Sequence, residues 1–139
     1  ETLGLSFKIV CLSKEKYFGL AKEWIDEQPV MITDREKTIV DGLDLPENVG
    51  GVGLVATALK QSWDQLRETK LHDYAGRIGN SAVAKRLGFL METLALGDAE
   101  ALLPVATRGS GYSRLDPTLP ATGKHNRRWG LLINAEVEG

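Results

Sequence analysis

The segment 80–97 constrains the fold of this chain most strongly, because its apolar residues recur at the spacing of one α-helix face. Asn80 and Ser81 are good helix N-caps, and Gly97 stands where a left-handed residue usually ends a helix. A helix with one apolar face needs other elements to cover it, so the segment predicts a packed core. The apolar residues of this face are Val83, Leu87, Leu90, Met91 and Leu94.

Three segments before this helix also predict helices. Residues 52–66 repeat the same apolar spacing, and another stretch follows at 71–78 after a brief break. We expect a short helix over 34–42, because Thr33 and Glu36 fit a capping box that satisfies free backbone N–H groups.

Strand patterns occupy the two ends of the chain. Segments 6–12, 17–25 and 30–33 predict a small antiparallel sheet, since their connections are too short for crossover helices. Residues 112–115 form a further short candidate, and we expect the closing strand 128–137 to pair back onto the N-terminal sheet. The predicted fold class is therefore α+β: a small antiparallel sheet packed with about four helices in a single domain over residues 1–139.

Composition narrows the class of protein. With 139 residues, 42% of them hydrophobic, and a net charge of −2, the chain is long enough for a core and unlike a disordered protein. No apolar run approaches the roughly 18 residues that span a bilayer. The single cysteine, Cys11, excludes an internal disulfide and a Cys-based zinc site. We expect a cytoplasmic domain without a membrane segment, cofactor or metal.

Catalytic motifs are weak. The glycines at 50–53 precede a helix, but the Lys-Ser/Thr pair of a P-loop is absent, so a sharp turn is the better interpretation. His72 and His125 lack metal-ligand spacing and are more typical of surface or capping histidines.

A metal-dependent nuclease, or another phosphoryl-processing enzyme, is the enzymatic alternative. Glu68 and Lys70 have the Glu-x-Lys spacing, and Asp41 and Asp44 are candidate partner carboxylates. This interpretation requires the fold to bring these carboxylates within metal-bridging distance.

Charge is distributed unevenly along the chain. Between residues 104 and 134, Asp116 is the one acid among five cations, and Tyr112 and Trp129 are interleaved with them. This pattern suits contacts with nucleic acid or with an acidic protein, and also a solvated loop with Trp129 in the core. The cations are Arg108, Arg114, Lys124, Arg127 and Arg128.

Several segments together resemble the AbiEi-type antitoxins. Residues 30–41 resemble that family's V-x-(V/I)-(S/T)-x-x-E-R-T-(L/I)-(L/V)-D stretch, and a Pro-Glu and Gly-Gly loop follows at 46–51. Residues 86–92 (RLGFLME) look like its (K/R)-R-L-G-(Y/F)-L-(L/M)-E helix, and 126–129 (NRRW) also fit. Lys37 departs from the pattern, because it stands where the family usually has arginine.

The resemblance implies the C-terminal domain of a type IV toxin–antitoxin component from bacterial phage-defence (abortive infection) loci. Such a domain is associated with neutralising a nucleotidyltransferase-like toxin, without the need for a stable complex. The family's N-terminal winged-helix domain, which binds promoter DNA and represses its own operon, is expected to be missing from this chain.

We therefore expect a non-enzymatic domain that works through a positive surface. Lys85 and Arg86, in the helix over 80–97, are expected to project sideways or outward and to join that surface. Glu36, Thr38 and Asp41 are expected to be structural. A stand-alone nucleic-acid-binding module remains an alternative to the antitoxin. The residues predicted for the surface are Lys85, Arg86, Arg108, Arg114, Arg127 and Arg128.

Overall fold

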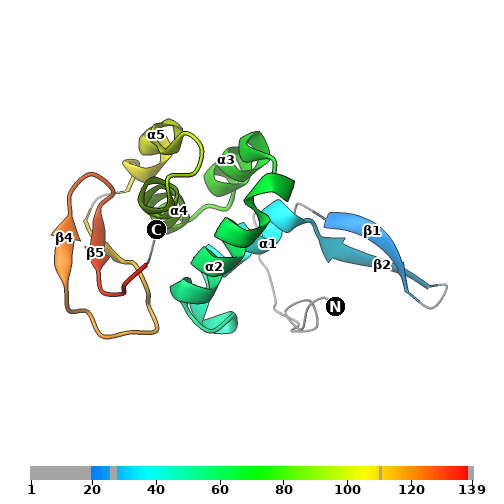
Figure 1. The fold of residues 1–139 in the computed structure, drawn as a ribbon, viewed down its shortest axis with the longest axis horizontal. Helices are drawn as coiled ribbons and strands as arrows, with labels where there is room; N and C mark the ends of the chain where they lie inside the picture. Colours follow the sequence, from blue (N-terminus) through cyan, green and yellow to red (C-terminus); the bar gives the residue numbers. More distant parts are fainter. Residues whose placement is uncertain (1–19, 26–27, 110, 138–139) are drawn as a thin grey trace.

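A hairpin, a group of helices and a small sheet follow one another along the molecule's long axis (Figure 1). The computed structural model describes residues 20–25, 28–109 and 111–137. The α+β class is confirmed. The strand predicted over 6–12 lies outside the described residues.

The N-terminal hairpin consists of β1 (Leu20–Ile25) and β2 (Gln28–Thr33). The two strands are antiparallel, with Leu20 opposite Thr33. They correspond to the strands predicted over 17–25 and 30–33. Figure 1 shows the hairpin at one end of the molecule, beyond α1.

Five α-helices follow among the described residues, with short 3-10 turns at Pro46–Asn48, Trp63–Gln65 and Ala99–Leu102. The helices are α1 (Arg35–Asp44), α2 (Val52–Ser62), α3 (Glu68–Arg77), α4 (Ser81–Leu94) and α5 (Leu103–Ala106).

Helix α4 forms the centre of the core and contacts α1, α3 and α5. Its predicted apolar face is buried. The Asn80 side chain caps it by accepting a hydrogen bond from the Ala82 N–H at 3.1 Å, as predicted. The predicted end at Gly97 is wrong, because Ala95 already takes the left-handed conformation (φ 57°) and its N–H bonds back to the last turn.

The start of α1 also differs from the predicted capping box. Asp34, rather than Thr33, is the N-cap, and its carboxylate accepts a hydrogen bond from the Lys37 N–H at 2.8 Å. Glu36 does not turn back to the helix start. It accepts a hydrogen bond from the Arg67 N–H at 2.7 Å, at the beginning of α3.

The C-terminal sheet consists of β3 (Ser113–Arg114), β4 (Lys124–Asn126) and β5 (Leu131–Ile133), in the order β3-β5-β4. It is mixed rather than antiparallel, because β3 runs parallel to β5 while β4 is antiparallel to it. The prediction that the closing strand pairs with the N-terminal sheet is wrong. The helices lie between the two (Figure 1).

Candidate binding surface

The two cations of α4, Lys85 and Arg86, are buried. Lys85 is 2% exposed and Arg86 is 6% exposed, so neither projects from the helix as predicted. The seven consecutive residues from Ala82 to Gly88 cover every side of the helix and all are buried, because other elements surround α4 at this level.

Arg86 joins three elements. Its Nε donates to the Arg114 carbonyl at 3.1 Å, and its Nη1 donates to the Leu43 carbonyl at 2.6 Å. Burial lowers the pKa of Arg86, while the nearby carboxylates of Asp44, Glu47 and Asp116 act in the opposite direction. This guanidinium is therefore a structural link between α4, the end of α1 and β3.

Lys85 lies directly beneath the sheet. Its Nζ donates to the Gly111 carbonyl at 3.2 Å. A Cβ on Gly130 would lie 3.3 Å from the same Nζ, so the Gly130 backbone packs closely against the ammonium. Burial, with Arg86 as a further cause, lowers the pKa of Lys85.

A tight joint holds the sheet against α4. Trp129 is 1% exposed, and a Cβ on Gly88 would come within 2.1 Å of its ring. The Glu92 carboxylate accepts hydrogen bonds from Trp129 Nε1 at 2.9 Å and from Arg128 Nε at 2.7 Å. Trp129 is thus a core residue, and its packing on α4 keeps the closing strand on this side of the helices.

The outward side of the sheet carries a row of exposed side chains. Arg114, Leu132 and His125 are neighbours across β3, β5 and β4. Leu131, the next residue in β5, is fully buried, so alternation of side chains turns this row away from the core. Arg114 and His125 are exposed and Leu132 is partly buried.

Tyr112 completes this surface. It is 48% exposed, and its ring meets that of His125 edge-to-face with centroids 4.5 Å apart. Lys124, at the start of β4, and Arg127, directly after β4, are both exposed. By the same alternation, Lys124 lies on the other side of β4 from His125, at the edge of the sheet. We define the outer face as Tyr112, Arg114, His125, Arg127 and Leu132, with Lys124 at its edge.

The outer face has an unbalanced positive charge. Among the described residues, none of its three cations has an ion pair, whereas Arg128 pairs with Glu92 and with Glu100. Asp116, the acid nearest in sequence, is 4% exposed. Its carboxylate is engaged by Thr118 and by the Val52 N–H.

Asp116 also explains the glycine-rich loop before α2. Gly50 and Gly51 have φ values of 94° and 108°, as a sharp turn requires. The first N–H of α2, from Val52, donates to the Asp116 carboxylate at 3.1 Å, across 64 residues of sequence. Since the protein's own carboxylate occupies this helix N-terminus, the phosphate-loop interpretation finds no support here.

Two acids near the start of α1, Asp34 and Glu36, also have structural partners. Asp34 accepts a hydrogen bond from the Tyr74 hydroxyl at 2.8 Å and pairs with Lys70 at 3.0 Å. Lys70 also lies 3.5 Å from Glu36. Although burial alone would raise the pKa of Asp34, these contacts and the Lys37 N–H hold it below its usual value. The cluster joins α1 to α3.

Glu36, Thr38 and Asp41, for which structural roles are expected, each have partners within the fold. Glu36 is 4% exposed and binds the start of α3. The Thr38 hydroxyl donates to the Asp34 carbonyl at 3.0 Å. Asp41 pairs at 2.9 Å with Lys37, which is fully buried. Lys37 is the residue that stands where the resembled pattern has arginine.

The residues of the nuclease alternative have separate partner sets. Asp41 pairs with Lys37, and Asp44 accepts a hydrogen bond from Asn80 at 2.8 Å. Glu68 accepts from the Asp98 N–H at 2.6 Å, and Lys70 pairs with Asp34. In the part of the chain that the structure describes, no group of three or more His, Cys, Asp or Glu residues is arranged to hold a metal ion.

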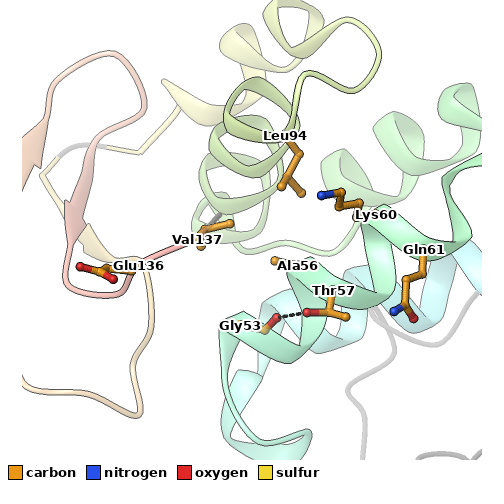
Figure 2. Close-up of a pocket in the computed structure, with 8 residues that line it drawn as sticks. All are labelled: Gly53, Ala56, Thr57, Lys60, Gln61, Leu94, Glu136 and Val137. Atoms are coloured by element: carbon orange, nitrogen blue, oxygen red, sulfur yellow. Dashed lines mark hydrogen bonds between the residues drawn. The ribbon is translucent and has the colours of Figure 1, made fainter. Parts of the chain in front are cut away.

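Two hollows lie away from the outer face. The larger, of about 670 Å³, is an open groove between α2, the end of α4 and Val137 (Figure 2). Figure 2 shows Ala56 and Leu94 on its walls and Lys60 at its edge. The smaller, of about 330 Å³, is lined by Arg108 and residues around the α3–α4 turn, and none of the outer-face residues lines it.

Of the six predicted surface cations, the structure therefore places Arg114 and Arg127 on the outer face. Arg128 is engaged by acids, Arg108 borders another hollow, and Lys85 and Arg86 are buried. His125 was not predicted as a member. Tyr112 directly precedes β3 and His125 lies in β4, with β5 between these two strands, and no local sequence pattern indicates such a contact.

Comparisons with known protein families, with curated proteins and with solved structures find no match to this chain. No helix among the described residues has both the length and the apolar character needed to cross a membrane.

Proposed function

We propose that this chain is the antitoxin domain of a bacterial type IV toxin–antitoxin system, and that it acts in the cytoplasm without catalysis. Its target in this proposal is a nucleotidyltransferase-like toxin, which it neutralises with or without a stable complex. The observation that carries the proposal is the outer face, where exposed cations without acidic partners among the described residues surround an aromatic pair.

The resembling segments add support, because their residues hold the fold together. Asp34 and Glu36 join α1 to α3, while Gly88 and Glu92 join α4 to Trp129. A chain that resembles the antitoxins at residues that hold its elements together is expected to resemble them in fold. The outer face is then the surface left free to act.

Growth rescue tests the proposal. The 139-residue chain is co-expressed with the toxin encoded next to its gene, and growth is compared for three versions. The first is the wild-type chain. The second carries Arg114→Glu, Lys124→Glu and Arg127→Glu on the outer face. The matched control carries Lys60→Glu, Arg67→Glu and Arg77→Glu, which change the net charge equally on α2 and at the two ends of α3.

We expect the wild type and the matched control to restore growth and the outer-face variant to fail. Circular dichroism and thermal melting establish that each version is folded. Full rescue by the outer-face variant would refute a role for this surface. A folded wild-type chain that gives no rescue would refute the antitoxin assignment of these residues.

A further inference from the structure

We infer that the outer face binds single-stranded nucleic acid, with a base stacked on the Tyr112–His125 pair and phosphates beside Arg114, Lys124 and Arg127. This inference rests on the proposed function, because it names the ligand class for the same face. The contacts of Tyr112, the register of the sheet and the charge around it support it in turn.

The aromatic pair provides the stacking surface. The rings of Tyr112 and His125 lie at 70° to each other with centroids 4.5 Å apart, which is a favourable edge-to-face contact. Nearly half of Tyr112 remains exposed. An exposed ring held in a fixed orientation is the feature on which unpaired bases stack, whatever their sequence.

The cations are spaced to follow a short strand of nucleic acid. Arg114 and His125 stand on the two edge strands of the sheet, with Leu132 between them. Since neighbouring strands are about 4.8 Å apart, this row is about 10 Å wide. Arg127 follows β4 two residues after His125, and the exposed Lys124 stands at the edge of the sheet at the start of β4.

The buried ammonium of Lys85, in α4, adds a positive charge behind the backbone next to the outer face. Its ammonium contacts the Gly111 carbonyl and lies against Gly130, which the sheet register places beside Tyr112. A buried charge is screened less than an exposed one and therefore raises the potential of the surface above it. An anion lying over the glycine backbone would receive this stabilisation.

The same observations favour nucleic acid over an acidic protein. Tryptophan is the strongest anchor in protein interfaces, and in this part of the chain Trp129 is turned into the core. The outer face instead offers one exposed tyrosine, one histidine and three cations around a partly buried leucine. That composition suits stacking and phosphate contacts better than an apolar interface core.

Fluorescence anisotropy with labelled oligonucleotides tests the inference directly. The folded 139-residue chain is titrated against oligothymidylate, oligouridylate and a DNA duplex at several salt concentrations. We expect both single strands to bind more tightly than the duplex, whose bases are not free to stack. With three phosphates contacted, the logarithm of affinity should fall with the logarithm of salt with a slope of about −2. The ratio between the two single strands tells whether RNA or DNA is preferred.

Variants separate stacking from charge. Tyr112→Ala should weaken binding about 5- to 100-fold, whereas Tyr112→Phe should stay within about twofold because the ring remains. Arg127→Ala should reduce the salt slope by about 0.7. Leu54→Ala removes another exposed side chain, in α2, and serves as the matched control with unchanged affinity.

Absence of binding by the folded wild type at low salt would overturn the inference, and so would wild-type affinity of Tyr112→Ala. If one of these two results is found and the outer-face variant still fails to rescue growth, the proposed function stands. The outer face would then be assigned to an acidic protein partner. Binding to single strands by a chain that gives no rescue would instead support the inference and refute the antitoxin proposal.

Discussion

At the scale of single residues, burial decides what each cation does. Arg86 and Arg127 are both arginines in segments that resemble the antitoxin pattern. Arg86 is 6% exposed and donates to two backbone carbonyls, whereas Arg127 is exposed after β4. A buried donor of this kind satisfies carbonyl groups that would otherwise lack partners, so its removal affects folding.

Arg86→Met should lower the free energy of unfolding by about 2–4 kcal/mol, because the Leu43 and Arg114 carbonyls lose their donor. Arg127→Met, the matched control, should change it by less than about 0.5 kcal/mol. Urea unfolding followed by circular dichroism measures both values. Equal stability of Arg86→Met and the wild type would contradict the structural role of Arg86.

Gly88 is a second residue whose role in stability a single substitution can test. Gly88→Ala should destabilise the protein by about 1–3 kcal/mol, because the added methyl group overlaps the Trp129 ring and must displace it. Gly53→Ala is the control in α2, where a Cβ meets nothing within 4 Å. That substitution should be neutral or stabilising by up to about 1 kcal/mol. Thermal melts that rank the two variants in the opposite order would argue against the Gly88–Trp129 joint.

At the scale of elements, backbone N–H groups at the start of helical segments donate hydrogen bonds to carboxylates from distant parts of the chain. Asp116 receives the first N–H of α2, and Glu36 receives the Arg67 N–H at the start of α3. Glu68 likewise accepts the Asp98 N–H in the segment after α4. These carboxylates lie near helix N-termini, where negative charge is stabilising, and they fix the positions of the helices relative to one another.

Asp116 gives this arrangement a pH dependence. Burial alone would raise the pKa of Asp116, but hydrogen bonds from Thr118 and Val52, and the charge of Arg86, hold it below the usual value of 3.8. The ionised carboxylate therefore stabilises the fold above about pH 4, and this contribution is lost as the pH falls through the lower native pKa.

Asp116→Asn should lower stability at pH 7 by about 1 kcal/mol, since the amide is a weaker partner for the helix N-terminus. The variant should also lose less stability than the wild type as the pH falls below about 4, because the native pKa of Asp116 lies below the usual 3.8. Urea unfolding across this range compares the two slopes. Parallel curves would contradict the assignment of acid sensitivity to Asp116.

At the scale of the whole molecule, the exposed cations of the outer face lie on the C-terminal sheet, at one end of the fold. The chain has a net charge of −2, but the C-terminal sheet has exposed cations on its outer face. Figure 1 shows this sheet at the end opposite the N-terminal hairpin, with α4 between them. A partner held by the outer face would therefore lie far from the hairpin.

Local patterns predicted most elements of this fold but not their long-range pairing. The period of α4 and its Asn80 cap are local signals, and both are found in the structure. The pairing of β5 depends on Trp129 fitting against Gly88, a contact between residues far apart in sequence. The distribution of charge along the sequence predicted a basic surface that included Lys85. Lys85 is buried instead, and no sequence pattern indicated this burial.

The central claim is that the partner of this chain binds the outer face. Amide NMR spectra of the ¹⁵N-labelled chain, recorded during a titration with oligothymidylate, test it most directly. We expect the largest chemical-shift changes on residues 112–114, 124–127 and 131–133. Changes centred on the groove between α2 and Val137, or spectra that do not change at low salt, would contradict it.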